Sequence, residues 1–131
     1  MELTPAQITK ILDAAWSLLG RPYADDFQCV DFVRAVYASA DITIPRLTSG
    51  SPPEDFNIRK ADLRNPPAGY IMFLKDRCDP RKERLWTHLV IILPLRTCIH
   101  CSLFYGEKVV ITPLAEIFER YDFAESKTLP I

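Results

Sequence analysis

The stretch Gly20-Arg21-Pro22-Tyr23-Ala24-Asp25-Asp26-Phe27-Gln28-Cys29-Val30-Asp31-Phe32-Val33 leads from a turn into the start of a helix. Its first part has a proline, two aspartates and no apolar periodicity, which indicates a turn. From Cys29 onward, apolar residues recur at helical spacing at 29, 32, 33, 36, 37 and 40. Cys29 therefore opens a helix, where unpaired N–H groups and the helix dipole are expected to lower the pKa of its thiol.

The residues before this stretch predict another helix. Thr4, Pro5 and Gln7 form a capping box with proline at the first helical position. Apolar residues then follow at helical spacing, and Gly20 stands where a left-handed C-terminal stop is expected. We expect a helix over residues 5–19.

The residues after the second helix predict a long connection followed by a sheet. Five prolines lie between residues 41 and 67, so this segment is expected to line or cover a cleft, with a short helical turn near 53–56. Apolar runs at 70–74, 86–93, 97–104 and 109–112 predict four antiparallel strands. Pro113 opens a last helix with Leu114, Ile117, Phe118 and Tyr121 on one face. The order predicts an α+β fold in which the helix of Cys29 packs on the sheet.

Length and composition restrict the function classes. The 131 residues are 48% hydrophobic and 25% charged, which predicts one globular domain over 1–131. A formal net charge of -1 gives no field that would hold nucleic acid or an anionic membrane. No apolar run is long enough to span a bilayer, and the chain has no signal-peptide pattern. We expect a soluble protein, either cytoplasmic or exported after leader removal or without a leader; the oligomeric state stays open.

The chain has two histidines, and both fall on predicted strands. His88 shares a face with Val90 and Ile92, and His100 shares a face with Cys98 and Ser102. If these strands pair across the turn at 94–96, both imidazoles face the same way. A cysteine at a helix start facing two such histidines has the groups that thiol catalysis needs: a nucleophile, an acid/base and an orienting group. On the residues alone, the more common situation is that such a cysteine is a small buried residue and such histidines are structural.

The cysteines allow two other interpretations. Four of them, at 29, 78, 98 and 101, can form two disulfides, but a chain of this length does not need them, and we expect free thiols. Cys98, His100 and Cys101, with Cys78 and His88 nearby, are also possible zinc ligands. Adjacent strand residues point to opposite faces, so His100 and Cys101 are poorly placed for one ion. We therefore predict no metal.

At these residues the chain resembles the NlpC/p60 family of papain-like cysteine peptidases, which cut peptidoglycan stem peptides. Members carry Gly-x-Pro-Tyr, a Cys at a helix start, a Pro-Arg pair, a Gly-Asp before a strand, a His opening the next strand and a third polar residue on the strand after. Here these elements stand in the same order as Gly20-Arg21-Pro22-Tyr23, Cys29, Pro45-Arg46, Gly69, His88 and His100. The chain departs from the family pattern around the thiol, where Gln28-Cys29-Val30-Asp31 replaces Asp-Cys-Ser-Gly and Ala24-Asp25-Asp26 replaces the usual glycines. It also has Tyr70 after Gly69 in place of Asp.

The resemblance implies a papain-like fold, with N-terminal helices on a central antiparallel sheet and a C-terminal helix. It implies that Cys29 attacks an amide carbonyl, that His88 shuttles the proton and that His100 orients His88. Tyr23 would help to hold the oxyanion, and Gln28 and Arg46 would line the substrate cleft. No cofactor is implied. The substrate would be the γ-D-glutamyl–diamino acid bond of peptidoglycan; an amidase or acyltransferase acting on another substrate and a non-catalytic binding module remain alternatives.

Overall fold

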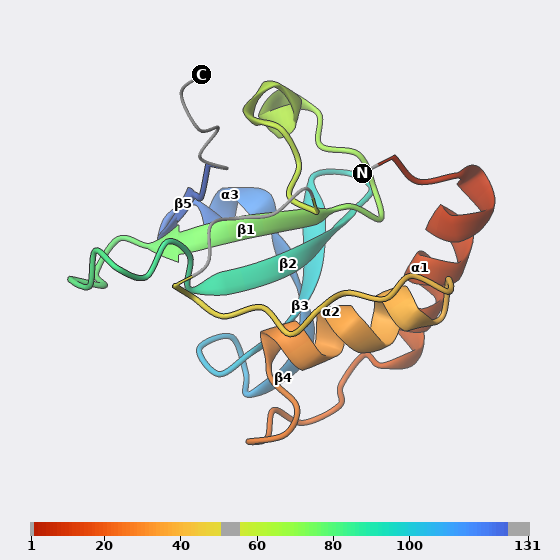
Figure 1. Ribbon diagram of the computed structural model, residues 1–131, viewed down its shortest axis with the longest axis horizontal. Helices are drawn as coiled ribbons and strands as arrows, with labels where there is room; N and C mark the ends of the chain where they lie inside the picture. The colour runs from red at the N-terminus through yellow and green to blue at the C-terminus, as the bar shows by residue number, and fades with distance from the viewer. Residues whose placement is uncertain (1, 51–55, 126–131) are drawn as a thin grey trace.

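A computed structural model describes residues 2–50 and 56–125 of the chain. Its centre is an antiparallel sheet with the strand order β4-β3-β2-β1-β5. The helices α1 (Pro5–Ser17) and α2 (Cys29–Ala38) lie together on one side of this sheet, and the short helix α3 (Leu114–Ile117) lies on the other (Figure 1). The predicted α+β, papain-like architecture is confirmed.

Helix α1 begins as its capping box predicts. The Gln7 backbone N–H donates to Thr4 Oγ1 at 3.2 Å, and the Thr4 N–H donates to the Gln7 side chain at 2.9 Å. The helix ends at Ser17, two residues before the predicted end. Gly20 then adopts φ +87°, and its N–H donates to the carbonyl of Val109 at 2.9 Å. A left-handed backbone at this point favours glycine, which turns the chain toward the edge of the sheet.

Helix α2 begins at Cys29, as the periodicity predicts, and ends at Ala38 instead of residue 40. The Asp31 carboxylate accepts the Gln28 backbone N–H at 2.9 Å, which satisfies a donor at the helix start. One face of the helix, formed by Phe32, Val33, Val36 and Tyr37, is fully buried against the sheet. Burial of this stripe fixes the rotation of α2, and with it the direction in which Cys29 points.

The five strands are β1 (Ile71–Asp76), β2 (His88–Leu93), β3 (Thr97–Ser102), β4 (Lys108–Pro113) and β5 (Tyr121–Phe123). β2 is buried along its whole length, so its two faces contribute to two apolar clusters. Leu89, Ile91 and Leu93 pack toward α1 and α2, whereas Val90 and Ile92 pack toward α3. This alternation assigns a side of the sheet to each side chain of the central strands.

The end of the chain differs from the prediction. The last helix is short, and Tyr121 belongs to β5, which pairs with β1 through Asp76 and Tyr121. The Arg77 side chain explains this end of the sheet, because it donates to the carbonyls of Glu119 and Phe118 and so holds the turn against β1. These are long-range contacts that helical spacing does not reveal. In the long connection, a 3-10 helix forms at Lys60–Arg64; the turn predicted near 53–56 lies outside the described residues.

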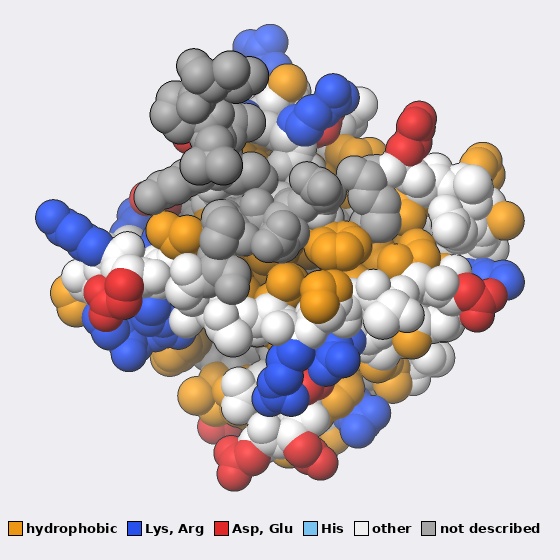
Figure 2. All heavy atoms as spheres, in the orientation of Figure 1, with side chains coloured by type: hydrophobic (Ala, Val, Ile, Leu, Met, Phe, Trp, Pro, Cys, Tyr) orange, Lys and Arg blue, Asp and Glu red, His pale blue; other side chains and the backbone are white. Residues whose placement is uncertain are grey.

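The distribution of surface charge fits the near-zero net charge of the chain, and the cysteines are free thiols, as expected. Figure 2 shows Lys and Arg side chains interspersed with Asp and Glu on the visible face, and no large area of one charge. All four cysteines are unpaired. Within residues 2–50 and 56–125, no helix has the length and apolar character needed to cross a bilayer.

Candidate active site

The Cys29 thiol lies at the point where β2 and β3 separate. Pairing of these strands runs from Leu93–Thr97 to Ile91–Ile99, so Leu89 lies beyond the last paired residues. The backbone N–H groups of Leu89 on β2 and of Val30 in the first turn of α2 both act to lower the pKa of the Cys29 thiol. Cys29 is thus held beside the residue that follows His88.

The expected low pKa of Cys29 is not found. Burial raises the pKa of the thiol above its ordinary value, and this effect outweighs the N–H groups of Leu89 and Val30, which lower it. The nearby Asp31 carboxylate raises the pKa further. The helix start alone predicts a low pKa, whereas the packing of α2 on the sheet leaves the thiol partly buried, which disfavours the thiolate. In the free protein, Cys29 is therefore a neutral thiol at neutral pH.

The two histidines form a direct hydrogen bond. His88 Nε2 lies 2.6 Å from His100 Nδ1, and the ring centroids are 4.9 Å apart. His88 is 6% exposed and His100 is fully buried. The prediction that both imidazoles face the same way from neighbouring strands is confirmed. Since Nε2 of His88 is taken by His100, Nδ1 is the nitrogen of His88 that is left to exchange a proton with a thiol.

Both imidazoles are neutral at neutral pH. Burial lowers the pKa of His100 to about 4. Burial also lowers the pKa of His88 well below its ordinary value, and the nearby His100 and Arg120 lower it further. A neutral His88 has a free lone pair and can act as a general base, so the free site contains a thiol and a base instead of a thiolate–imidazolium pair.

Aromatic residues and a threonine complete the surroundings of the histidines. Tyr121 stacks on His88 with ring centroids 5.4 Å apart, and Tyr105 packs its edge against His100 at 5.3 Å. Thr112 on β4 places its hydroxyl oxygen 2.9 Å from His100 Nε2. Sequence reasoning missed these three residues, because Tyr121 was assigned to a helix and no local pattern distinguishes Thr112 from other strand threonines.

Tyr23, which is predicted to bind the oxyanion, lies near enough to Cys29 for the two side chains to interact electrostatically. Burial raises the pKa of its phenol, and the electrostatic influence of Cys29 and Cys101 raises it further. Its backbone N–H donates to the carbonyl of Glu107 at 2.8 Å, which anchors the turn before α2 to the chain entering β4.

Within the described part of the chain, no hydrogen bond joins the Cys29 thiol to either imidazole.

A cavity of about 140 Å³ lies beside the start of α2. It brings together the other two predicted site residues, Gln28 and Arg46. Arg34 on α2 holds the proline-rich segment in place by donating to the carbonyl of Ile44 at 3.0 Å, two residues before Arg46. The prediction that this connection lines a cleft is confirmed at this point. The lining residues are Asp25, Gln28, Val30, Asp31, Arg46 and Leu47.

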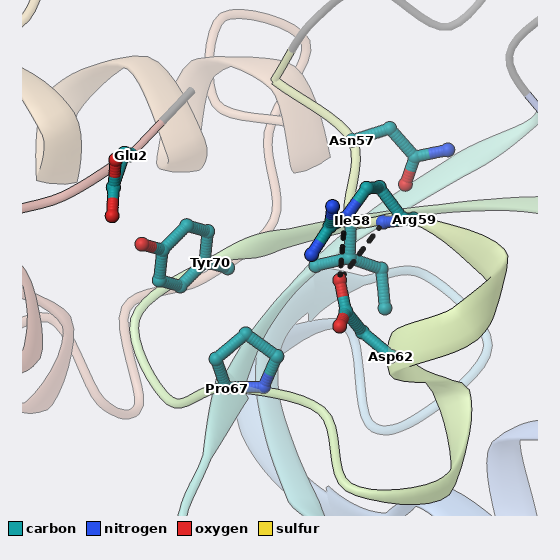
Figure 3. A pocket seen from close by; sticks show the side chains of 7 residues that line it. All are labelled: Glu2, Asn57, Ile58, Arg59, Asp62, Pro67 and Tyr70. Atoms are coloured by element: carbon teal, nitrogen blue, oxygen red, sulfur yellow. Dashed lines mark hydrogen bonds and ion pairs between the residues drawn. The ribbon is translucent and has the colours of Figure 1, made fainter.

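A larger cavity of about 450 Å³ lies elsewhere and contains none of the predicted site residues. Figure 3 shows Arg59 and Asp62 of its lining turned toward one another, and their side chains form an ion pair at 3.5 Å. The Asn57 amide is bonded to Ala124 and Phe73, and the Tyr70 hydroxyl accepts the Leu3 N–H. Because these polar groups are used within the protein, we place the candidate site at Cys29.

The zinc interpretation finds no support in the geometry. Cys101 belongs to the apolar cluster on the α2 side of the sheet, and its thiol donates to the carbonyl of Phe27 at 3.5 Å. Cys98 and His100 lie on the opposite side of β3. Among residues 2–50 and 56–125, no group of three or more His, Cys, Asp or Glu side chains is arranged to hold a metal ion.

Comparison with known proteins identifies similar solved structures. No protein-family model and no curated protein sequence matches the chain. An NlpC/P60 family protein from Bacillus cereus is 25% identical, with a TM-score of 0.70 over 94% of this chain and 40% of that one. The NlpC/p60 domain of the peptidoglycan hydrolase SagA is 24% identical, with a TM-score of 0.62 over 92% of this chain and 98% of that domain.

A similar protein of lower identity is the peptidoglycan hydrolase RipB from Mycobacterium tuberculosis. It is 19% identical, with a TM-score of 0.62 over 85% of this chain and 62% of that one. The chain therefore spans about two fifths of the Bacillus cereus protein and nearly all of the SagA domain.

Proposed function

We propose that this chain, a divergent member of the NlpC/p60 family, is a cysteine hydrolase that cleaves an amide bond in peptidoglycan stem peptides. One observation carries the proposal: Cys29 opens a helix beside the start of β2, where the hydrogen-bonded pair His88 and His100 is located. Peptidoglycan hydrolases with the same fold support the substrate class. The whole described chain would form this one catalytic domain.

The proposed mechanism begins from the neutral thiol and the neutral imidazole. Cys29 attacks the scissile carbonyl while His88 Nδ1 accepts the thiol proton, so that no free thiolate has to persist in the buried site. His88 then gives the proton to the leaving amine, and a thioester to Cys29 remains. A water molecule, deprotonated by His88, hydrolyses the thioester. The Cys29 backbone N–H and the Tyr23 hydroxyl would stabilise the oxyanion.

The cavity beside α2 supports a charged peptide substrate. Arg46 can pair with a substrate carboxylate, and Asp25 and Asp31 can pair with a substrate ammonium group. Gln28 adds an amide to the same lining. A stem-peptide residue carries both charges, which is why we favour the γ-D-glutamyl–diamino acid bond. No cofactor is needed for this chemistry.

The test is digestion of purified peptidoglycan fragments by the wild type, Cys29→Ala and Cys78→Ser. Cys78 is an exposed cysteine outside the candidate site, so its variant is a matched control. Mass spectrometry should show a new free amino group on the diamino acid with the wild type and Cys78→Ser, and no cleavage with Cys29→Ala. Identical product profiles for the wild type and Cys29→Ala would rule out the hydrolase proposal.

The changed residues around Cys29 favour two other outcomes of the same experiment. If the thioester is transferred to an added amine and water gives no product, the chain is an acyltransferase. If the wild type and Cys29→Ala bind the fragments equally and neither cleaves, it is a binding module. The raised pKa of Cys29 and the lack of a thiol–imidazole hydrogen bond in the described residues are the observations that keep this last function open.

A further inference from the structure

The hydrogen bond between His88 and His100 is followed by a second one, from His100 to a residue outside the proposed catalytic pair. His100 Nδ1 faces His88 at 2.6 Å, and His100 Nε2 faces the Thr112 hydroxyl at 2.9 Å. Thr112 is 4% exposed and His100 is fully buried, so water does not compete at this end of the chain of hydrogen bonds. Tyr105 covers His100, and Tyr121 covers His88.

A neutral imidazole carries one proton, so the protons along this chain can be ordered in only two ways. In the first, His88 Nε2–H donates to His100 Nδ1, and His100 Nε2–H donates to the Thr112 oxygen. His88 Nδ1 is then a free lone pair. In the second, the Thr112 hydroxyl donates to His100 Nε2, and His100 Nδ1–H donates to His88 Nε2. His88 then carries its proton on Nδ1 and cannot accept another from a thiol.

Proton transfer from Cys29 to His88 requires the first of these two proton arrangements. When His88 Nδ1 accepts the thiol proton, the Cys29 sulfur becomes the attacking nucleophile and His88 carries protons on both nitrogens. Its Nε2–H must donate to His100 Nδ1, so the single proton of His100 has to be on Nε2. Among the described residues, the acceptor for that proton is the Thr112 oxygen.

We propose that Thr112 is a positioning residue that accepts the His100 Nε2–H and thereby holds both histidines in the Nε2–H tautomer, leaving His88 Nδ1 free to take the Cys29 proton. The catalytic role of Thr112 rests on the proposed function, whereas the tautomers of the two histidines do not depend on that function. Tyr105, Tyr121 and Arg120 also face the histidine pair, and no hydrogen bond from them to either ring is found in the described structure.

Two variants separate the hydrogen bond from packing. Thr112→Val keeps a β-branched side chain of similar size but removes the acceptor, so His100 Nε2–H would be buried without a partner. The proton is then expected to move to His100 Nδ1, where it donates to His88 Nε2, and His88 becomes protonated on Nδ1. Thr112→Ser keeps the hydroxyl and should retain the wild-type tautomers.

The experiment is long-range ¹H–¹⁵N correlation NMR of the full chain labelled with ¹⁵N-histidine, at pH 7. The chain has two histidines, so a His100→Gln variant assigns both. We expect Nε2–H tautomers for both residues in the wild type and in Thr112→Ser, and an Nδ1–H tautomer for His100 in Thr112→Val. A wild-type His100 protonated on Nδ1 would overturn the proposal, even if Thr112→Val failed to fold. Unchanged tautomers in Thr112→Val would also overturn it.

Kinetics provides the second readout. With the stem-peptide substrate, kcat of Thr112→Val should fall by roughly 5- to 150-fold with KM unchanged, because returning to the productive tautomer would leave the buried His100 Nε2–H unpaired. Thr112→Ser should restore most of the loss. Equal kcat values for the wild type and Thr112→Val would contradict the catalytic part. If the wild type cleaves no peptidoglycan fragment, the proposed function fails, whereas the NMR result still decides the role of Thr112.

Discussion

Acid should destabilise the protein through His100, because this residue is buried as a neutral imidazole. In the unfolded chain a histidine binds a proton below about pH 6.5. In the folded protein, burial lowers the pKa of His100 to about 4. Between these two values the unfolded state binds more protons than the folded state. The free energy of unfolding therefore falls as the pH drops through this window, and above pH 6.5 the contribution of His100 is fully present.

The size of the effect follows from the width of the window. Each pH unit is worth about 1.4 kcal/mol for one proton, so His100 should remove about 3 kcal/mol of stability between pH 6.5 and 4. That is a large part of the roughly 5–15 kcal/mol that stabilises a typical domain. His88 adds to the loss in the same direction, because its pKa is also lowered by burial, by His100 and by Arg120.

The assay is urea unfolding at a series of pH values from 4 to 7.5, for the wild type and for His100→Gln. Glutamine keeps a polar side chain but does not titrate, so the stability difference between the two proteins isolates His100 from the carboxylates. This difference should change by about 3 kcal/mol across the window, with the wild type losing more stability toward acid. A difference that is the same at every pH would refute the assignment of His100 as a buried neutral residue.

Two further predictions concern the thiol and the core. The rate of Cys29 alkylation by iodoacetamide in the free protein should keep rising above pH 8.5, with no plateau between pH 4 and 8, because burial raises the pKa of the thiol. The exposed Cys78 is the reference in the same digest. A plateau in the rate at acid pH would indicate a thiolate–imidazolium pair instead. Tyr37→Phe should lower the free energy of unfolding by about 1–3 kcal/mol in urea, because the buried Tyr37 hydroxyl donates to the Gly69 carbonyl at 2.6 Å; unchanged stability would show that this hydrogen bond contributes nothing.

Much of the fold could be predicted because its signals are local. The capping box at Thr4 and the helical spacing after Cys29 placed the starts of α1 and α2 correctly. Apolar runs located β1 to β4. The end of the chain was predicted less well, since β5 exists through its pairing with β1 and through the Arg77 contacts. Such contacts join residues more than 40 positions apart, and no local pattern reports them.

The sequence by itself determined which groups are available for chemistry: a cysteine at a helix start, two histidines on neighbouring strands that face the same way, and an arginine in a proline-rich connection. These follow from periodicities of 3.6 and 2, which each element carries in its own residues. Only the tertiary structure decided the state of those groups. Packing of α2 on the sheet raises the pKa of Cys29, burial keeps His88 and His100 neutral, and Thr112 is placed against His100. Desolvation and hydrogen-bond partners depend on what surrounds a residue in space, and that is set only when the whole chain has folded.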